Sequence, residues 1–375
     1  MRKPEATRRQ FLQATGLTAA AAFAGARIAA QPQLPGPPAK KLGFAVVGLG
    51  SLAINQILPA FAHCRHAKAT ALVSGDAAKA KSLATTYGVP ESGLYSYETY
   101  DRLKDNADVD IVYVVLPNSM HPEYTVRAHK AGKHVLCEKP MANTPQDCEA
   151  MIAAAKAAGK KLMIGYRLRY EPNNMAMIKM AREQEFGKPK VILCEAGFSI
   201  GDPKQWRLKK ALAGGGSLMD IGIYALNAAR YLSGEEPVAI NAISYTTPGD
   251  VRFADGVEET INFQLRFPSG VLANCVSSYG VGLNRFRVHA EKASFELEPA
   301  LSYSDLRMRV LRGGTVELRS LPERNQFALE MDHMAECVQG NAEPRTPGEE
   351  GLKDLRAMMA IYEAARSSKT VTLNA

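Results

Sequence analysis

A glycine-rich segment near the front of the sequence has the spacing of a phosphate-binding loop. Residues 48–53 read Gly-Leu-Gly-Ser-Leu-Ala, which is G-x-G-x-x-A, directly after an apolar run and before a helical pattern. Such glycines permit a tight turn and let the backbone approach a pyrophosphate, whose charge is met by amide groups at the helix N-terminus. In this context the pattern predicts a bound dinucleotide, contacted by Gly48, Leu49, Gly50, Ser51 and Leu52.

The end of the second expected strand indicates which dinucleotide is bound. NAD enzymes place an acidic side chain there, against the ribose 2′-hydroxyl. Here the strand ends in Ser74 and Gly75, and Lys79 follows. This leaves room for a 2′-phosphate and offers it a hydroxyl and a positive charge, which favours NADP. Asp76 supports the alternative, NAD, if its side chain turns inward.

Polar residues that can do chemistry stand at three further places. Residues 116–121 and the Glu138-Lys139-Pro140 segment each follow an expected strand, where ligands bind in open α/β sheets. Later in the chain, a loop of three glycines leads into an expected helix with Asp220 and Tyr224. These two residues are four positions apart and therefore lie on one helix face.

The elements that position these residues alternate between strand and helix in the first half of the chain. We expect strands over residues 43–48, 69–74, 110–116 and 134–137. Between them we expect helices up to residue 64 and over 77–87, 121–131 and 144–158. This alternation predicts a Rossmann domain, with a doubly wound parallel sheet, over residues 43–163.

From about residue 164 the pattern changes to long alternating strands. We expect strands over residues 190–199, 238–245, 257–267, 271–278 and 285–297, with hairpin turns at 268–270 and 313–314. Helices are expected over residues 173–184, 326–339 and 349–366. Residues 164–375 are therefore predicted to form an α+β domain with a large, mainly antiparallel open sheet, and the chain is of the α/β class.

The composition is that of a folded enzyme, and half of its excess positive charge lies at the front. The chain has 375 residues, 46 of them Lys or Arg and 38 Asp or Glu, for a net charge of +8. Residues 1–30 have a net charge of +4, and 41 basic and 37 acidic residues remain without them. No basic run is interleaved with aromatic residues, so we expect no nucleic-acid partner.

Residues 1–30 have the pattern of a twin-arginine signal peptide. Arg8-Arg9 precede an apolar stretch of about 13 residues and small-residue cleavage sites that end at Ala26 or Ala30. The stretch is too short to span a bilayer, which takes about 20 residues. We expect a cleaved leader, a periplasmic product exported in the folded state, and no stable membrane association after cleavage. Residues 31–42 are expected to form a proline-rich arm.

Six cysteines are scattered through the chain without C-x-x-C spacing or histidine clusters. We expect neither a zinc site nor a disulfide framework, and no metal is predicted. The cysteines are interpreted as small buried hydrophobic residues. His289 and His333 are interpreted as structural.

Together these motifs resemble those of the Gfo/Idh/MocA oxidoreductases, and within them the branch of periplasmic glucose-fructose and aldose-aldose oxidoreductases. The resemblance covers residues 43–370 and the leader. Most of the family have Asp-x-x-x-His in the second-domain motif, whereas this sequence has Asp220 and Tyr224, as the glucose-fructose branch does. The proline-rich arm is shorter than in glucose-fructose oxidoreductase.

The resemblance implies roles for individual residues. Lys139, Asp220 and Tyr224 take the family's catalytic roles and contact the substrate, while Ser74 and Lys79 hold the 2′-phosphate. The other implied contacts lie along the cofactor or the sugar, and they are Tyr97, Leu116, Asn118, His121, Glu138, Arg167, Trp206 and Arg207. A homo-oligomer, either dimer or tetramer, is also expected.

These residue types suit the oxidation of an aldose at C1, in which a hydride and a hydroxyl proton must leave. A tyrosine is a poor base at neutral pH, but a neighbouring ammonium favours its phenolate form. Our hypothesis makes Tyr224 the proton acceptor and Lys139 the group that lowers the pKa of Tyr224 and holds the sugar hydroxyl. Asp220 is then the acceptor that orients other sugar hydroxyls.

The expected export constrains the catalytic cycle, because free NADP(H) is not expected outside the cytosol. We therefore expect a tightly bound cofactor that one sugar reduces and a second sugar reoxidises. The first sugar is an aldose that becomes an aldonolactone, and the second is a ketose or aldose that becomes an alditol. Two alternatives stay open: an ordinary aldose 1-dehydrogenase with dissociable NAD(P), and a nicotinamide-dependent binding protein without turnover.

Overall fold

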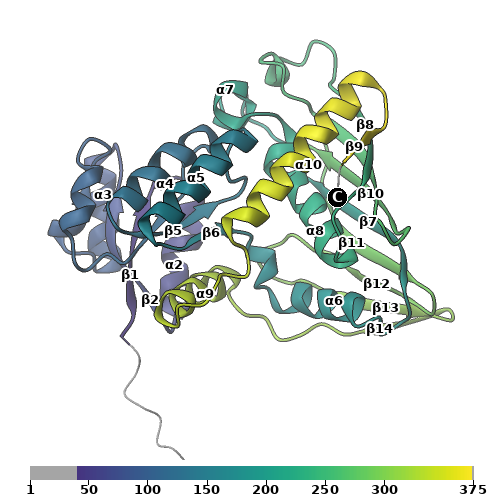
Figure 1. The fold of residues 1–375 in the computed structure, drawn as a ribbon, viewed down its shortest axis with the longest axis horizontal. Helices are drawn as coiled ribbons and strands as arrows, with labels where there is room; N and C mark the ends of the chain where they lie inside the picture. Colours follow the sequence, from purple (N-terminus) through teal and green to yellow (C-terminus); the bar gives the residue numbers. More distant parts are fainter. Residues whose placement is uncertain (1–39, 374–375) are drawn as a thin grey trace, which may run out of the picture. The chain divides into compact units, whose positions relative to one another are not determined.

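The computed structural model describes residues 40–373, so the expected signal peptide and most of the proline-rich arm lie outside the described residues. From Lys41 onward the chain forms one compact unit that contains two sheets (Figure 1). Among the residues described, no helix is long and apolar enough to cross a membrane.

The first sheet has six parallel strands in the order β3-β2-β1-β4-β5-β6. They are β1 (Leu42–Val47), β2 (Ala67–Val73), β3 (Leu94–Tyr95), β4 (Ile111–Val114), β5 (His134–Glu138) and β6 (Leu162–Gly165). The strand order reverses between β1 and β4, and ligands bind outside the carboxyl ends of strands at such a switch point. The predicted doubly wound parallel sheet is confirmed, with β3 and β6 added to the four expected strands.

Helices cover both faces of this sheet. They are α2 (Leu58–Ala60), α3 (Ala77–Tyr87), α4 (His121–Lys130), α5 (Pro145–Ala158) and, from much later in the chain, α9 (Gln326–Gln339). Ala45 and Val47 of β1 pack in the core that contains α4 and α5, whereas Phe44 and Val46 pack in the core that contains α9. A strand buried on both faces is apolar throughout. Figure 1 shows α9 beside β2, although the two elements are far apart in the sequence.

The second sheet has nine strands in the order β14-β13-β12-β11-β7-β10-β9-β8-β15. They are β7 (Pro189–Gly197), β8 (Ala239–Tyr245), β9 (Thr260–Arg266), β10 (Leu272–Ser278), β11 (Leu283–Ala290), β12 (Ser294–Leu297), β13 (Met308–Arg312), β14 (Thr315–Leu318) and β15 (Val371–Thr372). Only the β7–β10 pair is parallel among the pairs of this sheet. The predicted mainly antiparallel sheet is confirmed.

The prediction of a single strand over residues 285–297 is wrong. Residues 285–297 form two antiparallel strands, β11 and β12, rather than one. The chain turns at the exposed Glu291 and Lys292, where the amide of Ala290 donates to the carbonyl oxygen of Ala293 at 2.9 Å. Two exposed charged residues break the alternation of buried and exposed side chains, so the segment turns there.

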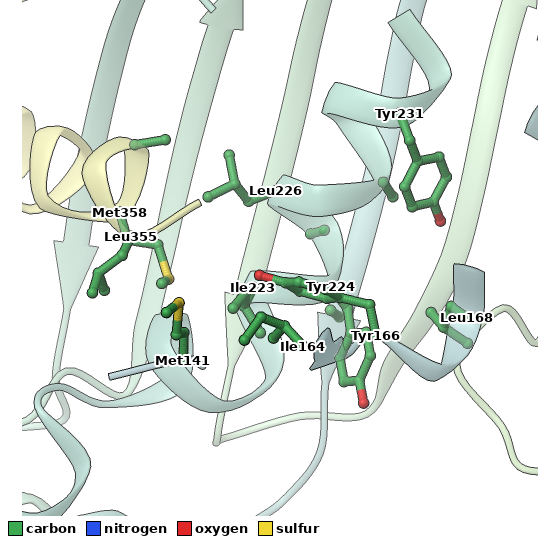
Figure 2. Close-up of a cluster of buried hydrophobic side chains, with 14 of the residues drawn as sticks. Met141, Ile164, Tyr166, Leu168, Ile223, Tyr224, Leu226, Tyr231, Leu355 and Met358 are labelled. Atoms are coloured by element: carbon green, nitrogen blue, oxygen red, sulfur yellow. The ribbon is translucent and has the colours of Figure 1, made fainter. Parts of the chain in front are cut away.

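Three helices pack on one face of the second sheet: α6 (Pro172–Arg182), α8 (Ile223–Ser233) and α10 (Gly348–Ser367). In β9, Ile261, Phe263 and Leu265 are buried toward them, while Asn262 and Gln264 are exposed on the other face. Figure 2 shows side chains of α8, among them Tyr224, packed with Leu355 and Met358 of α10 and with Ile164 and Tyr166 of the first half. A single core therefore joins the two sheets.

The structure agrees with the interpretation of the cysteines as buried residues and of His289 and His333 as structural residues. All six cysteines are buried and unpaired. The ring of His289 bonds the hydroxyl of Ser294 at 2.8 Å across the β11–β12 pair, and His333 accepts from the amide of Arg345 at 3.0 Å. These contacts are structural.

Candidate active site

A cavity of about 400 Å³ lies at the carboxyl ends of the first sheet's strands. It gathers most of the residues expected to bind the cofactor: Gly48, Leu49, Gly50, Ser51, Leu52, Ser74, Gly75, Lys79, Tyr97, Leu116, Asn118, Glu138, Lys139, Trp206 and Arg207, together with Asp220. Residues from Gly48 to Asp220 thus meet in one cavity. Two expected contacts, His121 and Arg167, do not line it.

The glycine-rich loop leaves space where a pyrophosphate has to approach. Gly48 has φ +94°, and a Cβ there would lie 2.4 Å from the carbonyl oxygen of Val115, so only glycine fits. A Cβ at Gly50 would meet no atom within 4 Å, which leaves the backbone open to the cavity. The helix that follows contains a π-helical turn over Ala53–Ile57. The residues present fit a dinucleotide, with the loop amides at the helix N-terminus.

The residues after β2 fit a 2′-phosphate better than a free 2′-hydroxyl. Asp76 is the N-cap of α3, and its Oδ1 accepts from the amide of Lys79 at 2.9 Å. The hydroxyl of Ser74 accepts from the amide of Asp76 at 3.0 Å. Asp76 also lines the cavity, and its Oδ2 lies 3.9 Å from the Lys79 ammonium. Because its Oδ1 caps the helix, Ser74, Gly75 and the Lys79 ammonium are placed to hold the ribose end of the cofactor.

A second cavity, of about 790 Å³, adjoins the first. The two cavities share Ser51, Leu52, Glu138, Lys139, Arg207 and Asp220, and Tyr224 and Arg167 line only the second. The catalytic candidates therefore lie where the second cavity meets the cofactor cavity. Other lining residues were not predicted from the sequence because they belong to no recognised motif. They come from the helix after the glycine-rich loop, from β11 and from loops, and among them are Asn55, Gln56, Phe198, Gln205, Asn284 and Tyr303.

Asp220 is held between two cations. The Lys139 ammonium donates to the Asp220 carbonyl oxygen at 2.6 Å and lies 3.4 Å from Oδ1, while Arg207 Nε lies 3.0 Å from Oδ2. The Tyr279 hydroxyl also donates to Oδ2 at 3.1 Å. Burial disfavours the charged carboxylate, but Arg207 and Lys139 outweigh it and hold the pKa of Asp220 below its ordinary value. Asp220 lies in a π-helical turn, Leu218–Gly222, a feature frequent at functional sites.

Tyr224 is also contacted by two cations, Lys139 and Arg167, and the one at its hydroxyl is not the expected one. The Lys139 ammonium lies 4.7 Å from the centre of the Tyr224 ring, whereas Arg167 Nε donates to the Tyr224 hydroxyl oxygen at 3.0 Å. Burial raises the pKa of Tyr224 to about 12, and Arg167 opposes this rise. The cation that contacts this hydroxyl is therefore Arg167 rather than the expected Lys139, whose ammonium donates to Asp220.

His121 is a structural residue rather than a ligand contact. It is fully buried, and it lines neither cavity. Its two ring nitrogens lie 2.8 and 2.9 Å from the carbonyl oxygens of Leu116 and Pro140. The ring thus links the loops that follow β4 and β5, and burial lowers the pKa of His121 to about 4. A motif position beside a strand end does not reveal whether a side chain points outward or inward.

Comparisons with known proteins agree with this geometry. The model of an oxidoreductase family with an NAD-binding Rossmann fold matches residues 42–166, and the model of the GFO/IDH/MocA C-terminal domain matches residues 175–296. The chain is 32% identical to D-xylose 1-dehydrogenase [NADP(+)] of Haloarcula marismortui, over 88% of this chain and 93% of that protein. It is 27% identical to 1,5-anhydro-D-fructose reductase of Ensifer adhaerens, over 88% and 97%.

The solved structure of aldose-aldose oxidoreductase from Caulobacter crescentus, complexed with glycerol, is 56% identical to this chain. It superposes with a TM-score of 0.87 and covers 89% of this chain and 100% of its own. The matched models, the two sheets and the joined cavities agree: the chain belongs to the Gfo/Idh/MocA oxidoreductase family.

Proposed function

We propose that the protein is an NADP-dependent sugar oxidoreductase that keeps its cofactor bound, oxidises an aldose at C1 to an aldonolactone and reduces a second sugar to an alditol. The observation that carries this proposal is that Lys139 and Asp220 lie in both cavities, with Tyr224 in the second. The named activities of the Caulobacter and Haloarcula relatives, on aldoses and on D-xylose, support the substrate class.

The chain's own groups have distinct tasks in this reaction. When bound, the nicotinamide supplies the acceptor, and later the donor, of the hydride. Lys139 donates to a sugar oxygen at the junction of the cavities, and Asp220 holds Lys139 and Arg207 in place. Tyr224 exchanges the proton of the reacting sugar oxygen, as base in the oxidation and as acid in the reduction.

Retention of the cofactor is supported by the segment of residues 198–213, here called the strap. The strap contributes Trp206 and Arg207 to the cofactor cavity. Its Ile200 and Leu208 are buried in a small core of their own with Phe253, Val257 and Tyr279. The strap is also tied to the turn that follows β4, because Asn118 Nδ2 donates to the carbonyl oxygen of Ala213 at 2.9 Å. A cavity wall anchored on both sides slows exchange of a bound ligand.

Purified protein tests the proposal directly. Protein prepared without added nucleotide is expected to contain NADP, and an aldose is expected to produce the fluorescence of the reduced nicotinamide. A ketose or second aldose should then remove that fluorescence and allow turnover without free cofactor. Loss of NADP on dilution, with turnover that depends on fresh NADP, would favour the ordinary aldose dehydrogenase that the Haloarcula relative exemplifies. Absence of activity on any sugar would favour a binding protein.

Two further parts of the proposal concern assembly and location. We propose a homo-oligomer formed through the open face of the second sheet, where Ile243, Tyr245 and Leu272 are 76%, 58% and 48% exposed. An Ile243→Asp variant that leaves the mass in solution unchanged would argue against this face.

The proposal of periplasmic export by the twin-arginine route rests on residues 1–30. It predicts that replacing Arg8 and Arg9 by lysine retains the protein in the cytoplasm.

A further inference from the structure

Arg167 is a buried cation whose hydrogen-bond partners are all neutral. It begins the 3-10 turn after β6, and 5% of its surface is exposed. Its Nε donates to the Tyr224 hydroxyl at 3.0 Å, its Nη1 to Gln326 Oε1 at 2.6 Å and its Nη2 to the carbonyl oxygen of Leu301 at 2.6 Å. Within residues 40–373, no carboxylate oxygen lies within the 4.0 Å of an ion pair from this guanidinium.

Such a placement is costly unless negative charge lies or forms nearby. The buried carboxyl groups of Glu138 and Glu330 interact with Arg167 through space, but burial raises the pKa of both and so disfavours their charged forms. Taking a charged group out of water costs several kcal/mol, roughly, and an uncompensated buried charge is strongly destabilising. Of the oxygens that Arg167 contacts, those of Gln326, Leu301 and Ser302 belong to amides and do not ionise. The Tyr224 hydroxyl is the contact that gains a negative charge when it loses its proton, and the low-dielectric cavity strengthens that attraction.

The same contact decides where the Tyr224 proton points. Because Arg167 Nε–H donates to the hydroxyl oxygen, the O–H of Tyr224 must be directed elsewhere. The guanidinium lies over the ring of Tyr224 at 4.9 Å and over the ring of Tyr303 at 4.6 Å. Both tyrosines line the 790 Å³ cavity, as does Arg167. The hydroxyl proton is thereby free to meet an oxygen bound in that cavity.

We propose that Arg167 is a positioning residue that aims the Tyr224 hydroxyl at the reacting sugar oxygen and stabilises its phenolate, an inference that rests on the proposed function. In the aldose half-reaction the C1–H and C1 hydroxyl O–H bonds break and a C1=O bond forms. The hydride goes to the nicotinamide, and the proton goes to the phenolate oxygen of Tyr224. In the second half-reaction the hydride returns to a carbonyl carbon, and Tyr224 gives the proton to its oxygen.

The electrostatic surroundings agree with this assignment. Burial raises the pKa of Tyr224, and Arg167 is the largest of the influences that lower it. The titratable groups that face Tyr224 or Arg167 come from several elements, and they are Tyr113, Glu138, Lys139, Asp220, Tyr303 and Glu330. Glu138 and Asp220 raise the pKa of Tyr224, so Arg167 acts against them.

A titration of Tyr224 tests the inference without any need for sugar turnover. Cofactor-loaded protein with a Tyr224→3-fluorotyrosine substitution reports ionisation of the phenol through its ¹⁹F chemical shift. In an Arg167→Met background the midpoint is expected to rise by about one pH unit or more, as for loss of an opposite charge within 4–6 Å. Gln326→Glu is the second variant, because a carboxylate facing Nη1 neutralises the guanidinium and should also raise the midpoint.

Arg169→Met is the matched control, since Arg169 lies in the same turn but pairs with Glu350 and stacks on Tyr231. It should leave the midpoint of residue 224 in place. An unchanged midpoint in both Arg167→Met and Gln326→Glu, with folding verified by circular dichroism, overturns the inference. Free guanidinium should restore the rate of cofactor reduction by an aldose in Arg167→Gly. If the midpoint shifts as expected but the protein oxidises no sugar, the proposed function is contradicted while the electrostatic role of Arg167 is supported.

Discussion

The Lys139 ammonium lies 2.6 Å from the backbone carbonyl oxygen of Asp220 and 3.4 Å from its carboxylate. Lys139 follows a strand of the first sheet and Asp220 lies in a helical turn that packs on the second. This one contact therefore joins the cofactor-binding half of the chain to the half that completes the sugar cavity.

Lys139→Met is expected to slow reduction of the bound cofactor by an aldose about 100-fold or more, the range for loss of a group that assists proton transfer. The substitution removes the donor to the sugar oxygen and leaves Asp220 with Arg207 and the Tyr279 hydroxyl as partners. Single-turnover absorbance of the nicotinamide measures the rate, and the NADP content of the purified variant shows whether the cofactor site is intact. Full activity with bound NADP would contradict the role of Lys139.

Lys79→Met is expected to weaken NADP binding about tenfold or more and to leave NAD binding unchanged, because a hydrogen bond to a charged group contributes about 1.5–3 kcal/mol. Competition between the two dinucleotides for the stripped protein measures the change. Lys81→Met is the matched control, since Lys81 lies on the same helix but pairs with the exposed Glu91 outside the cavity. Equal losses for NAD and NADP would mean that Lys79 does not contact the 2′-phosphate.

Leu208→Ala is expected to accelerate release of bound NADP about tenfold or more. Leu208 is fully buried in the core of the strap and lines neither cavity, so its truncation loosens the strap without touching the ligand. Large-to-small core substitutions of this kind cost about 2–5 kcal/mol. Leu265→Ala, in a buried position of β9, is the control. Equal release rates in the two variants would show that the strap does not retain the cofactor.

The stability of the protein is expected to fall as the pH drops from about 6.5 toward 4, in part because of His121. The pKa of His121 is lowered to about 4 in the fold, whereas that of a histidine in the unfolded chain is near 6.5. Between pH 6.5 and 4, His121 is protonated in the unfolded chain but neutral in the folded protein. The contribution of His121 to the free energy of unfolding is therefore fully present above pH 6.5 and is lost as the pH falls toward 4. The shift corresponds to about 3 kcal/mol.

Urea unfolding of the wild type and of His121→Gln at pH 7.5 and 4.5 isolates this contribution. The variant should lose less stability on acidification than the wild type. Both ring nitrogens lie within 2.9 Å of carbonyl oxygens, and a protonated ring donates from both nitrogens. The result that contradicts the prediction is therefore well defined. If the two proteins lose equal stability, His121 accepts a proton in the folded state and donates to both carbonyl groups.

The sequence predicted the cofactor cavity well because its residues stand where local rules apply. A glycine-rich turn between strand and helix, or a polar residue directly after a strand, is placed by its immediate neighbours. Gly48 and Gly50, Ser74, Asn118 and Lys139 all meet in one cavity for that reason.

The partners of the catalytic candidates were not predictable in the same way. Arg167 and Tyr224 are 57 positions apart, and Arg167 and Gln326 are 159 positions apart. Such contacts depend on how α8 and α9 pack, which no motif specifies. The π-helical turns were missed because their residues, such as Leu218–Gly222, have the same types as those of an α-helix.

The position of α9 has a consequence for biosynthesis. Phe327, Met331 and Met334 cover one face of the first sheet, and the carboxylate of Asp332 accepts from the amides of Arg65 and His66. A ribosome therefore has to release residues up to about Gln339 before the dinucleotide-binding half can close its core, although all six strands of that sheet are made by Gly165. Cofactor loading is then a late event of synthesis that follows completion of nearly the entire polypeptide.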